Sequence, residues 1–282
     1  MKALKFDKYV AAGNDFVIFD GRKDLGLNYN DLAFKVCNRH FGIGSDGIMV
    51  CENSDVADIK MMYFNSDGSQ GEMCGNGIRS FAKYIYDNGI VKKKAISIET
   101  LAGIKYIELE TDEFDKASKI KVNMGKPVFE GAKIPVNIHK ERVLEETIRI
   151  DNKDYIFSAV LVGVPHVVIF IENIEDVDVN GLGKKIENHE LFPNKTNVNF
   201  VEILGRNKIN IYTWERGAGR TLGCGTGSCA SVVIGNVLSR LDNKVLVNTE
   251  GGNLEVHLID DYEIIMIGEA FHIASGEYFY HC

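Results

Sequence analysis

The chain has 282 residues, of which 45% are hydrophobic and 26% charged, and its formal net charge is −8. These values are typical of a globular protein with a sizeable core, in one large domain or two of about 140 residues. The acidic balance argues against nucleic acid as the main partner. No apolar run approaches the roughly 18 residues that span a bilayer, and the N-terminus lacks a signal-peptide core. We therefore expect a cytoplasmic protein with no membrane partner.

Residues 4–19 are rich in Val, Ile, Phe and Tyr around Gly13-Asn14, which predicts two strands joined by a turn. Asn30 is placed to cap a short helix that reaches Cys37. Residues 42–47 read as a turn-rich loop, and residues 59–64 as a strand that runs into a turn at Asp67-Gly68.

A second helix is predicted directly after the phrase Cys74-Gly75-Asn76-Gly77. Apolar residues then recur with the period of a helix that buries one face, at Ile78, Phe81, Ala82 and Ile85. Gly89 ends this pattern. Residues 96–98, 104–109 and 120–124 read as strands, and the break at residues 125–127 (Gly-Lys-Pro) marks a domain boundary.

The second half of the chain repeats this plan. Strands are predicted at residues 155–162, 167–171, 197–203 and 209–214. A polar loop then leads to a second phrase, Cys224-Gly225-Thr226-Gly227, which is followed by another amphipathic helix. Short strands fill the chain from residue 245 onward. Many strands with few helices predict an α+β fold.

An internal repeat accompanies the two cysteine phrases. Cys74 and Cys224 are 150 positions apart, and the same offset aligns residues 64–65 with 214–215 and residues 13–18 with 163–168. Three segments at one ungapped offset indicate two copies of one supersecondary unit. We expect two lobes related by a pseudo-twofold axis, with corresponding loops that converge on a shared cleft.

Each cysteine phrase predicts an anion site beside a thiol. The first turn of a helix leaves N–H groups unpaired, and its dipole favours negative charge. The glycines lack a Cβ, so a carboxylate can approach these amides closely. The same field should lower the pKa of each cysteine and favour the thiolate. A thiolate can act as a nucleophile, a metal ligand or a base.

Two equivalent thiols favour acid–base chemistry among these choices. A nucleophilic cysteine generally works with one base and one orienting group. Taking a proton from one face of a carbon and returning one to the other face needs two equivalent groups. Amides at both helix starts would stabilise the carbanion between these steps. The sequence therefore predicts racemisation or epimerisation next to a carboxylate, with no cofactor, because it carries no pyridoxal-phosphate lysine signature.

The remaining cysteines carry no such context. A single cysteine is more often a buried small residue than a catalyst, and we assign that role to Cys37, Cys51, Cys229 and Cys282. No C-x-x-C pair and no H-E-x-x-H segment occurs, so the spacing predicts no metal site.

Several longer phrases surround the two cysteines: residues 13–17 (GNDFV), 39–47 (RHFGIGSDG), 64–69 (FNSDGS), 73–79 (MCGNGIR), 165–166 (PH), 197–200 (NVNF), 214–219 (WERGAG) and 224–227 (CGTG). With these phrases the sequence resembles the diaminopimelate epimerase family over nearly its whole length. The resemblance implies two lobes, each a mixed sheet curled around a central helix, with the active site between them. The lobes would comprise residues 1–124 plus 270–282, and residues 125–269, with the C-terminal strand in the first lobe.

The resemblance also implies a reaction, the interconversion of LL- and meso-diaminopimelate in lysine and peptidoglycan precursor synthesis. The substrate would be a small amino acid, with no cofactor and no metal, and a homodimer is compatible with it. The site residues carried over by motif are Cys74 and Cys224 as acid–base thiols; Gly75, Asn76, Gly225 and Thr226 around the reacting carboxylate; Asn14, Asn65, Asn197, Glu215 and Arg216 as substrate contacts; and His166 and Glu215 as catalytic helpers. Arg216 would grip the distal carboxylate bidentately, Glu215 the distal ammonium, and His166 would support proton handling near a thiol.

One position departs from the family pattern. The family has Asn before Pro-His, where this chain has Val164. Valine removes a hydrogen-bonding group, at a cost of about 1–3 kcal/mol if a partner is left bare. Because of Val164, we retain an alternative function: a cofactor-independent racemase or epimerase that acts on another amino acid or diamino acid.

Two further interpretations compete for the same phrases. Residues 225–230 match G-x-G-x-x-A, a dinucleotide fingerprint, but that site needs a strand running directly into the motif and a polar loop intervenes. The second competing interpretation is a redox switch in which Cys74 and Cys224 form a disulfide. We treat it as a side reaction of two facing thiols.

Overall fold

The computed structural model describes residues 1–281, so the packing role expected for Cys282 lies outside the described residues. The chain divides into two compact units. Unit 1 comprises residues 1–122 and the chain from residue 268 onward, and unit 2 comprises residues 123–267. Across the described residues, every helix is too short or too polar to cross a lipid bilayer.

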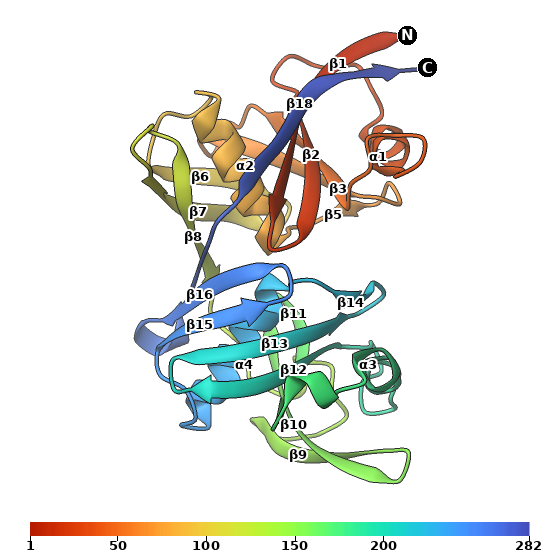
Figure 1. Cartoon of the computed structure of the whole chain (residues 1–282), viewed down its shortest axis with the longest axis vertical. Coiled ribbons are helices and arrows are strands. Elements are labelled where there is room, and N and C mark those ends of the chain that lie inside the picture. The colour runs from red at the N-terminus through yellow and green to blue at the C-terminus, as the bar shows by residue number, and fades with distance from the viewer. Residues whose placement is uncertain (282) are drawn as a thin grey trace. The chain divides into compact units, whose positions relative to one another are not determined.

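Unit 1 is a mixed sheet whose strands surround helix α2 (Gly75–Asp87), with helix α1 (Tyr29–Cys37) against β3 and β4 (Figure 1). The pairing runs β18-β1-β2-β3-β4-β6-β7-β8, and it is antiparallel except for β2–β3 and β4–β6. The strands are β1 (Lys2–Ala11), β2 (Asn14–Asp20), β3 (Gly47–Glu52), β4 (Ile59–Asn65), β5 (Gln70–Gly71), β6 (Ala95–Thr100), β7 (Gly103–Thr111), β8 (Ala117–Gly125) and β18 (Phe271–Tyr280).

Unit 2 has the same plan around helix α4 (Gly225–Val237), with helix α3 (Val179–Glu187) packed on β12 and β13. Its pairing runs β9-β10-β11-β12-β13-β15-β16, and it is antiparallel except for β11–β12 and β13–β15. The strands are β9 (Val143–Ile150), β10 (Lys153–Val162), β11 (Val164–Ile171), β12 (Asn197–Gly205), β13 (Lys208–Glu215), β14 (Gly219–Thr221), β15 (Lys244–Thr249), β16 (Gly252–Leu258) and β17 (Ile264–Gly268). Two 3₁₀ turns complete it, η1 (Ile174–Asp176) and η2 (Asp260–Tyr262).

The internal repeat predicted from the sequence extends to every helix. Both α1 and α3, and both α2 and α4, begin and end 150 positions apart. The order of pairing is also the same, since in each unit two antiparallel pairs are followed by a parallel pair. The expectation of an α+β fold built from two copies of one unit is therefore confirmed.

The two central helices are buried on nearly all sides, for different sequence reasons. In α2 the apolar stripe of Ile78, Phe81 and Ile85 is wholly buried, and the polar Arg79 and Ser80 are buried as well. The α4 helix is built largely from Gly, Ser, Cys, Ala and Val, which let strands approach it closely. Its hydrophobic contacts with four strands stabilise unit 2.

The C-terminal strand lies in the first unit. It pairs with β1 over its whole length, from Lys2 opposite Tyr280 to Val10 opposite Phe271 (Figure 1). The Tyr280 hydroxyl donates to Asp31 of α1, and the ammonium of Lys35 lies 4.6 Å from the centre of the Tyr280 ring. These contacts tie the chain end to the first helix.

Some local predictions are wrong. The cap of α1 is Asn28, whose side chain accepts from the Asp31 amide, while Asn30 donates to the carbonyl of Gly68. The sequence reading also missed α3, β3 and β9. The α3 segment carries Gly181 and Gly183, which weaken a helical pattern. Gly183 is needed because a Cβ there would lie 2.6 Å from Trp214.

Candidate active site

Cys74 is the N-cap residue of α2. Its sulfur accepts a hydrogen bond from the Gly77 amide at 3.4 Å, and its side chain is half-buried. A Cβ on Gly77 would lie 2.2 Å from the terminal methyl of Met49, so glycine permits the close packing of the helix start against β3. The thiol therefore sits among the N–H groups that begin the helix, as the phrase predicted.

A directional chain of hydrogen bonds fixes the amides beside Cys74. Arg79, which is fully buried, donates to the Asn76 side-chain oxygen at 2.9 Å and to the Gly75 carbonyl at 3.1 Å. Asn76 in turn donates to the Asn14 side-chain oxygen at 2.6 Å, and Asn14 donates to Asp46 at 3.0 Å. Two residues predicted to bind substrate, Asn14 and Asn76, are thus in direct contact.

Asn65 lies at the end of β4, in the same unit. Its side-chain oxygen accepts from the Tyr63 hydroxyl at 2.6 Å, and its amide donates to the Ser69 hydroxyl at 2.9 Å. The turn that follows is as expected, with Gly68 at φ 84° and the Ser69 amide bonded to Asp67. These bonds hold the Asn65 amide in one orientation.

Cys224 begins α4 at the place that Cys74 takes in α2. It is buried, with 6% of its surface exposed, and its sulfur lies 3.4 Å from the Thr226 hydroxyl oxygen. Burial raises the pKa of Cys224 well above its ordinary value, and the neighbouring Glu215 carboxylate raises it further. The hydrogen bonds from Thr226 and the Gly227 amide act in the opposite direction. The expectation that the helix start would lower this pKa is therefore wrong, because desolvation outweighs the helix-terminal amides.

The loop after β13 carries Glu215 and Arg216. The Glu215 carboxylate accepts from the Thr221 hydroxyl at 2.6 Å. The Arg216 amide donates to the Asn197 side chain at 2.8 Å, and the same Asn197 amide donates to the Pro165 carbonyl at 3.0 Å. Asn197 therefore holds this loop against β11, whatever contact it also makes with a substrate.

The buried carboxylate of Glu187 also supports the loop that carries Glu215 and Arg216. Glu187, at the end of α3, is 4% exposed. It accepts from the Trp214 indole at 2.7 Å and from the Gly217 amide at 3.2 Å, and Lys195 lies 3.5 Å from it. The loop that presents Glu215 and Arg216 is thus fixed at both ends.

His166 lies in β11 and is fully buried. Burial lowers the pKa of His166 to about 3, and the charge of Arg216 adds to that effect. The ring is therefore neutral at physiological pH. Its Nδ1 atom lies 3.2 Å from the side-chain nitrogen of Asn199.

Within each unit, the structure brings some of the predicted residues together. Asn14, Asn76 and Cys74 cluster at the start of α2, and Glu215, Thr226 and Cys224 cluster at the start of α4. We name these clusters, each with its neighbouring predicted residues, the Cys74 half-site and the Cys224 half-site. Among the described residues, no three His, Cys, Asp or Glu side chains gather to hold a metal ion.

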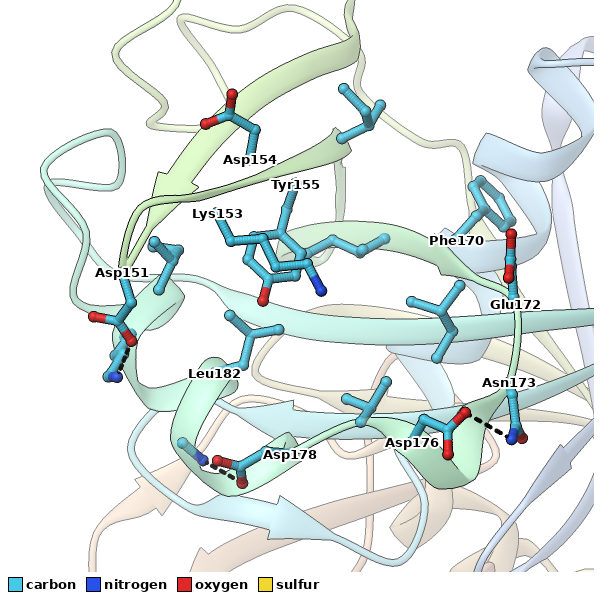
Figure 2. Close-up of a pocket in the computed structure, with 17 residues that line it drawn as sticks. Asp151, Lys153, Asp154, Tyr155, Phe170, Glu172, Asn173, Asp176, Asp178 and Leu182 are labelled. Carbon is cyan, nitrogen blue, oxygen red and sulfur yellow. Dashed lines mark hydrogen bonds and ion pairs between the residues drawn. The ribbon is translucent and has the colours of Figure 1, made fainter.

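A groove of about 750 Å³ lies elsewhere in unit 2, lined by η1, α3 and strands β10 and β11 (Figure 2). It includes none of the predicted site residues. Three of its acidic side chains serve local structure: Asp151 pairs with Lys185, Asp178 caps α3 through the Gly181 amide, and Asp176 accepts from Asn173. We therefore assign the groove no part in the chemistry.

Sequence reasoning missed three residues that fix these half-sites, namely Arg79, Glu187 and Asn199. Each is a buried polar residue, and the sequence marks them only weakly. Arg79 interrupts the apolar stripe of α2, and Asn199 alternates with Val198 and Phe200 in a strand. A charged or amide side chain at a core position is the one available signal.

The fold defines a class of two-unit α+β proteins. A solved structure of a Bacillus anthracis phenazine biosynthesis protein of the PhzF family superimposes with a TM-score of 0.72, covers 99% of this chain and 100% of that chain, and is 18% identical in sequence. At that identity the likeness concerns the fold alone.

Sequence comparison then specifies the family. The profile of the diaminopimelate epimerase family matches residues 6–130 and 158–273. A diaminopimelate epimerase of Alkaliphilus metalliredigens is 48% identical, over 98% of this chain and 97% of that protein. One from Caldanaerobacter subterraneus is 45% identical, over 97% and 99%. The chain belongs to the diaminopimelate epimerase family, which confirms the resemblance and makes the chain an isomerase.

Proposed function

We propose that the chain epimerises LL-diaminopimelate to meso-diaminopimelate, in the supply of lysine and peptidoglycan precursors, by transferring protons between two thiols and one α-carbon. The observation that carries the proposal is the pair of cysteine N-caps at equivalent places in α2 and α4. Membership of the family supports the substrate. The two helix starts supply N–H groups for the carboxylate of the reacting centre.

The two thiols have unequal surroundings, which suggests their starting roles. Burial and Glu215 raise the pKa of Cys224, so this residue starts as the protonated thiol. Cys74 is half-buried and its sulfur accepts the Gly77 amide, so it starts as the base. The Cα–H bond breaks as its proton passes to the Cys74 thiolate. The Cys224 S–H proton then goes to the opposite face of the carbanion, and the roles reverse in the other direction.

We assign the rest of the substrate to the residues around each thiol. Asn14 uses one N–H on Asp46 and keeps the second for a substrate oxygen. Asn197 holds the backbone amide of Arg216, and we assign the Arg216 guanidinium to the distal carboxylate, which a guanidinium can bind bidentately. Glu215 would take the distal ammonium. Val164 stands at the start of β11, and its side chain carries no hydrogen-bonding group.

Solvent isotope exchange tests the reaction. LL-diaminopimelate in D2O should gain α-deuterium at one centre only as it converts to the meso form. Cys74→Ala and Cys224→Ala should each abolish net conversion, because each removes one of two required acid–base groups. Cys229→Ala is the matched control, since Cys229 is buried in α4 away from its start and should leave turnover close to normal.

Full turnover by either thiol variant would defeat the two-thiol mechanism. The same exchange assay, run across a panel of amino acids and diamino acids, tests the alternative substrates that Val164 keeps open. Exchange with another amino acid, and none with diaminopimelate, would retain the mechanism and replace the substrate. Val164→Asn should then shift the preference back toward diaminopimelate.

A further inference from the structure

Three buried polar side chains lie beneath the start of α4, and we call them the amide network. They are His166 of β11, Asn199 of β12 and Thr213 of β13. His166 and Asn199 are completely buried, and Thr213 is 3% exposed. A Cβ on Gly227 would lie 2.3 Å from the side-chain oxygen of Asn199, so the network packs directly against the helix turn that Cys224 begins.

The orientation of the Asn199 amide follows from its partners. The backbone carbonyl of Val167 can only accept, so the Asn199 atom 2.9 Å from it is the nitrogen. The Thr213 hydroxyl lies 3.1 Å from the other end and donates to the oxygen. The second N–H of the same nitrogen is directed at Nδ1 of His166, at 3.2 Å. Nδ1 must therefore accept, and the proton of the neutral ring resides on Nε2.

That Nε2–H group has no hydrogen-bond partner among the described residues, although it is fully buried. A buried donor without an acceptor costs about 1–3 kcal/mol. Such a group in a native protein calls for an explanation, and an acceptor brought by a ligand is one.

The internal repeat shows that the fold does not require a buried donor without an acceptor at this place. At the 150-residue offset, His166, Asn199 and Thr213 correspond to Phe16, Met49 and Tyr63. Met49 occupies the equivalent place beneath α2, since its methyl lies 2.2 Å from a Cβ on Gly77. Phe16 and Met49 are also buried, so unit 1 has apolar side chains at the places of His166 and Asn199, and Tyr63 at the third place bonds to Asn65. At the places of His166 and Asn199, packing is thus satisfied without polar groups, and the polar pair in unit 2 serves another purpose.

We propose that Asn199 is a positioning residue, backed by Thr213, which holds His166 as a neutral Nε2–H donor for an oxygen of the amino-acid substrate in the Cys224 half-site. The proposal rests on the proposed function and adds a residue to it. A pKa near 3 agrees with this role, because His166 then gives a hydrogen bond without becoming charged. A fixed donor stabilises negative charge as it develops on the substrate.

Nitrogen-15 NMR of histidine-labelled protein tests the tautomer directly, with His166→Gln to assign the signals. We expect a protonated Nε2 and a bare Nδ1 in the unmutated protein. Asn199→Asp places an acceptor opposite Nδ1, so the ring should become protonated there. The value of kcat should fall about 10–100-fold, by analogy with the loss seen when the hydrogen-bond partners of metal-binding histidines are changed. Met49→Leu changes the equivalent place in unit 1, and it should leave the nitrogen-15 signals of His166 and the tautomer of its ring unchanged.

A ligand titration then tests the donor role. In the Cys74→Ala variant, which should not turn over, LL-diaminopimelate should shift the Nε2–H signal of His166. An Nδ1–H tautomer in the unmutated protein, or an unshifted Nε2–H signal at saturation, would overturn the proposal even if Asn199→Asp failed to fold. If the tautomer is as expected but the enzyme acts on another amino acid, the proposed substrate fails and that amino acid replaces it in the titration.

Discussion

Gly77 and Gly227 occupy equivalent positions in the two units. The effect of the same substitution, glycine to alanine, can therefore be compared between them. Each is the third residue of its central helix, and a Cβ on either would lie a similar distance from the preceding cysteine, at 3.2 and 3.3 Å. What differs is the next neighbour. Gly77→Ala meets the terminal methyl of Met49 at 2.2 Å, and Gly227→Ala meets the side-chain oxygen of Asn199 at 2.3 Å.

The two substitutions should differ in cost. Met49 ends in a flexible chain that can turn aside, so Gly77→Ala should cost about 1–3 kcal/mol for overpacking, offset by about 1 kcal/mol of helix propensity. The Asn199 amide is held by bonds with Thr213, His166 and Val167. Displacing it breaks one or two buried bonds at about 1–3 kcal/mol each. After the same helix-propensity gain, Gly227→Ala should be worse by about 2 kcal/mol.

Thermal unfolding of the two variants measures this difference. At roughly 2–4 °C per kcal/mol for units of this size, Gly227→Ala should melt about 4–8 °C below Gly77→Ala. A double-mutant cycle supplies the control: with Asn199→Ala in place, the extra cost of Gly227→Ala should disappear. Equal melting temperatures, or a lower one for Gly77→Ala, would refute the idea that the Asn199 amide is rigidly held.

Two further predictions concern buried groups of unit 1. Arg79→Met should destabilise the protein by more than about 3 kcal/mol, because it removes charged donors from the Gly75 carbonyl and the Asn76 amide oxygen; a urea midpoint close to that of the unmutated protein would contradict this. Burial raises the pKa of Cys51 from 9.0 to about 12, so between these pH values the unfolded chain loses a proton that the folded chain keeps. Stability should fall there by about 1.4 kcal/mol per pH unit from this group. The free energy of unfolding, measured at several pH values, should fall less steeply with pH for Cys51→Ala, by that amount per pH unit. An unchanged dependence on pH would count against a raised pKa of Cys51.

The sequence by itself determined the repeat and the place of both thiols. The 150-residue offset and the period of the apolar residues depend only on local patterns, which the helices α2 and α4 follow. The phrases around Cys74 and Cys224 also identified the family, because glycine and cysteine at a helix start have a definite chemical meaning. The elements that sequence reasoning missed, such as α3, depend on packing against distant residues like Trp214.

Only the tertiary structure decided how the two thiols differ. The phrases at Cys74 and Cys224 are nearly identical, yet burial and Glu215 raise the pKa of Cys224. Likewise, Asn199 and Met49 occupy equivalent places, and the direction of the Asn199 amide is set by a carbonyl on one neighbouring strand and a hydroxyl on another. Desolvation and hydrogen-bond direction both depend on which strands pack over a residue, and that is fixed by contacts far apart in the chain.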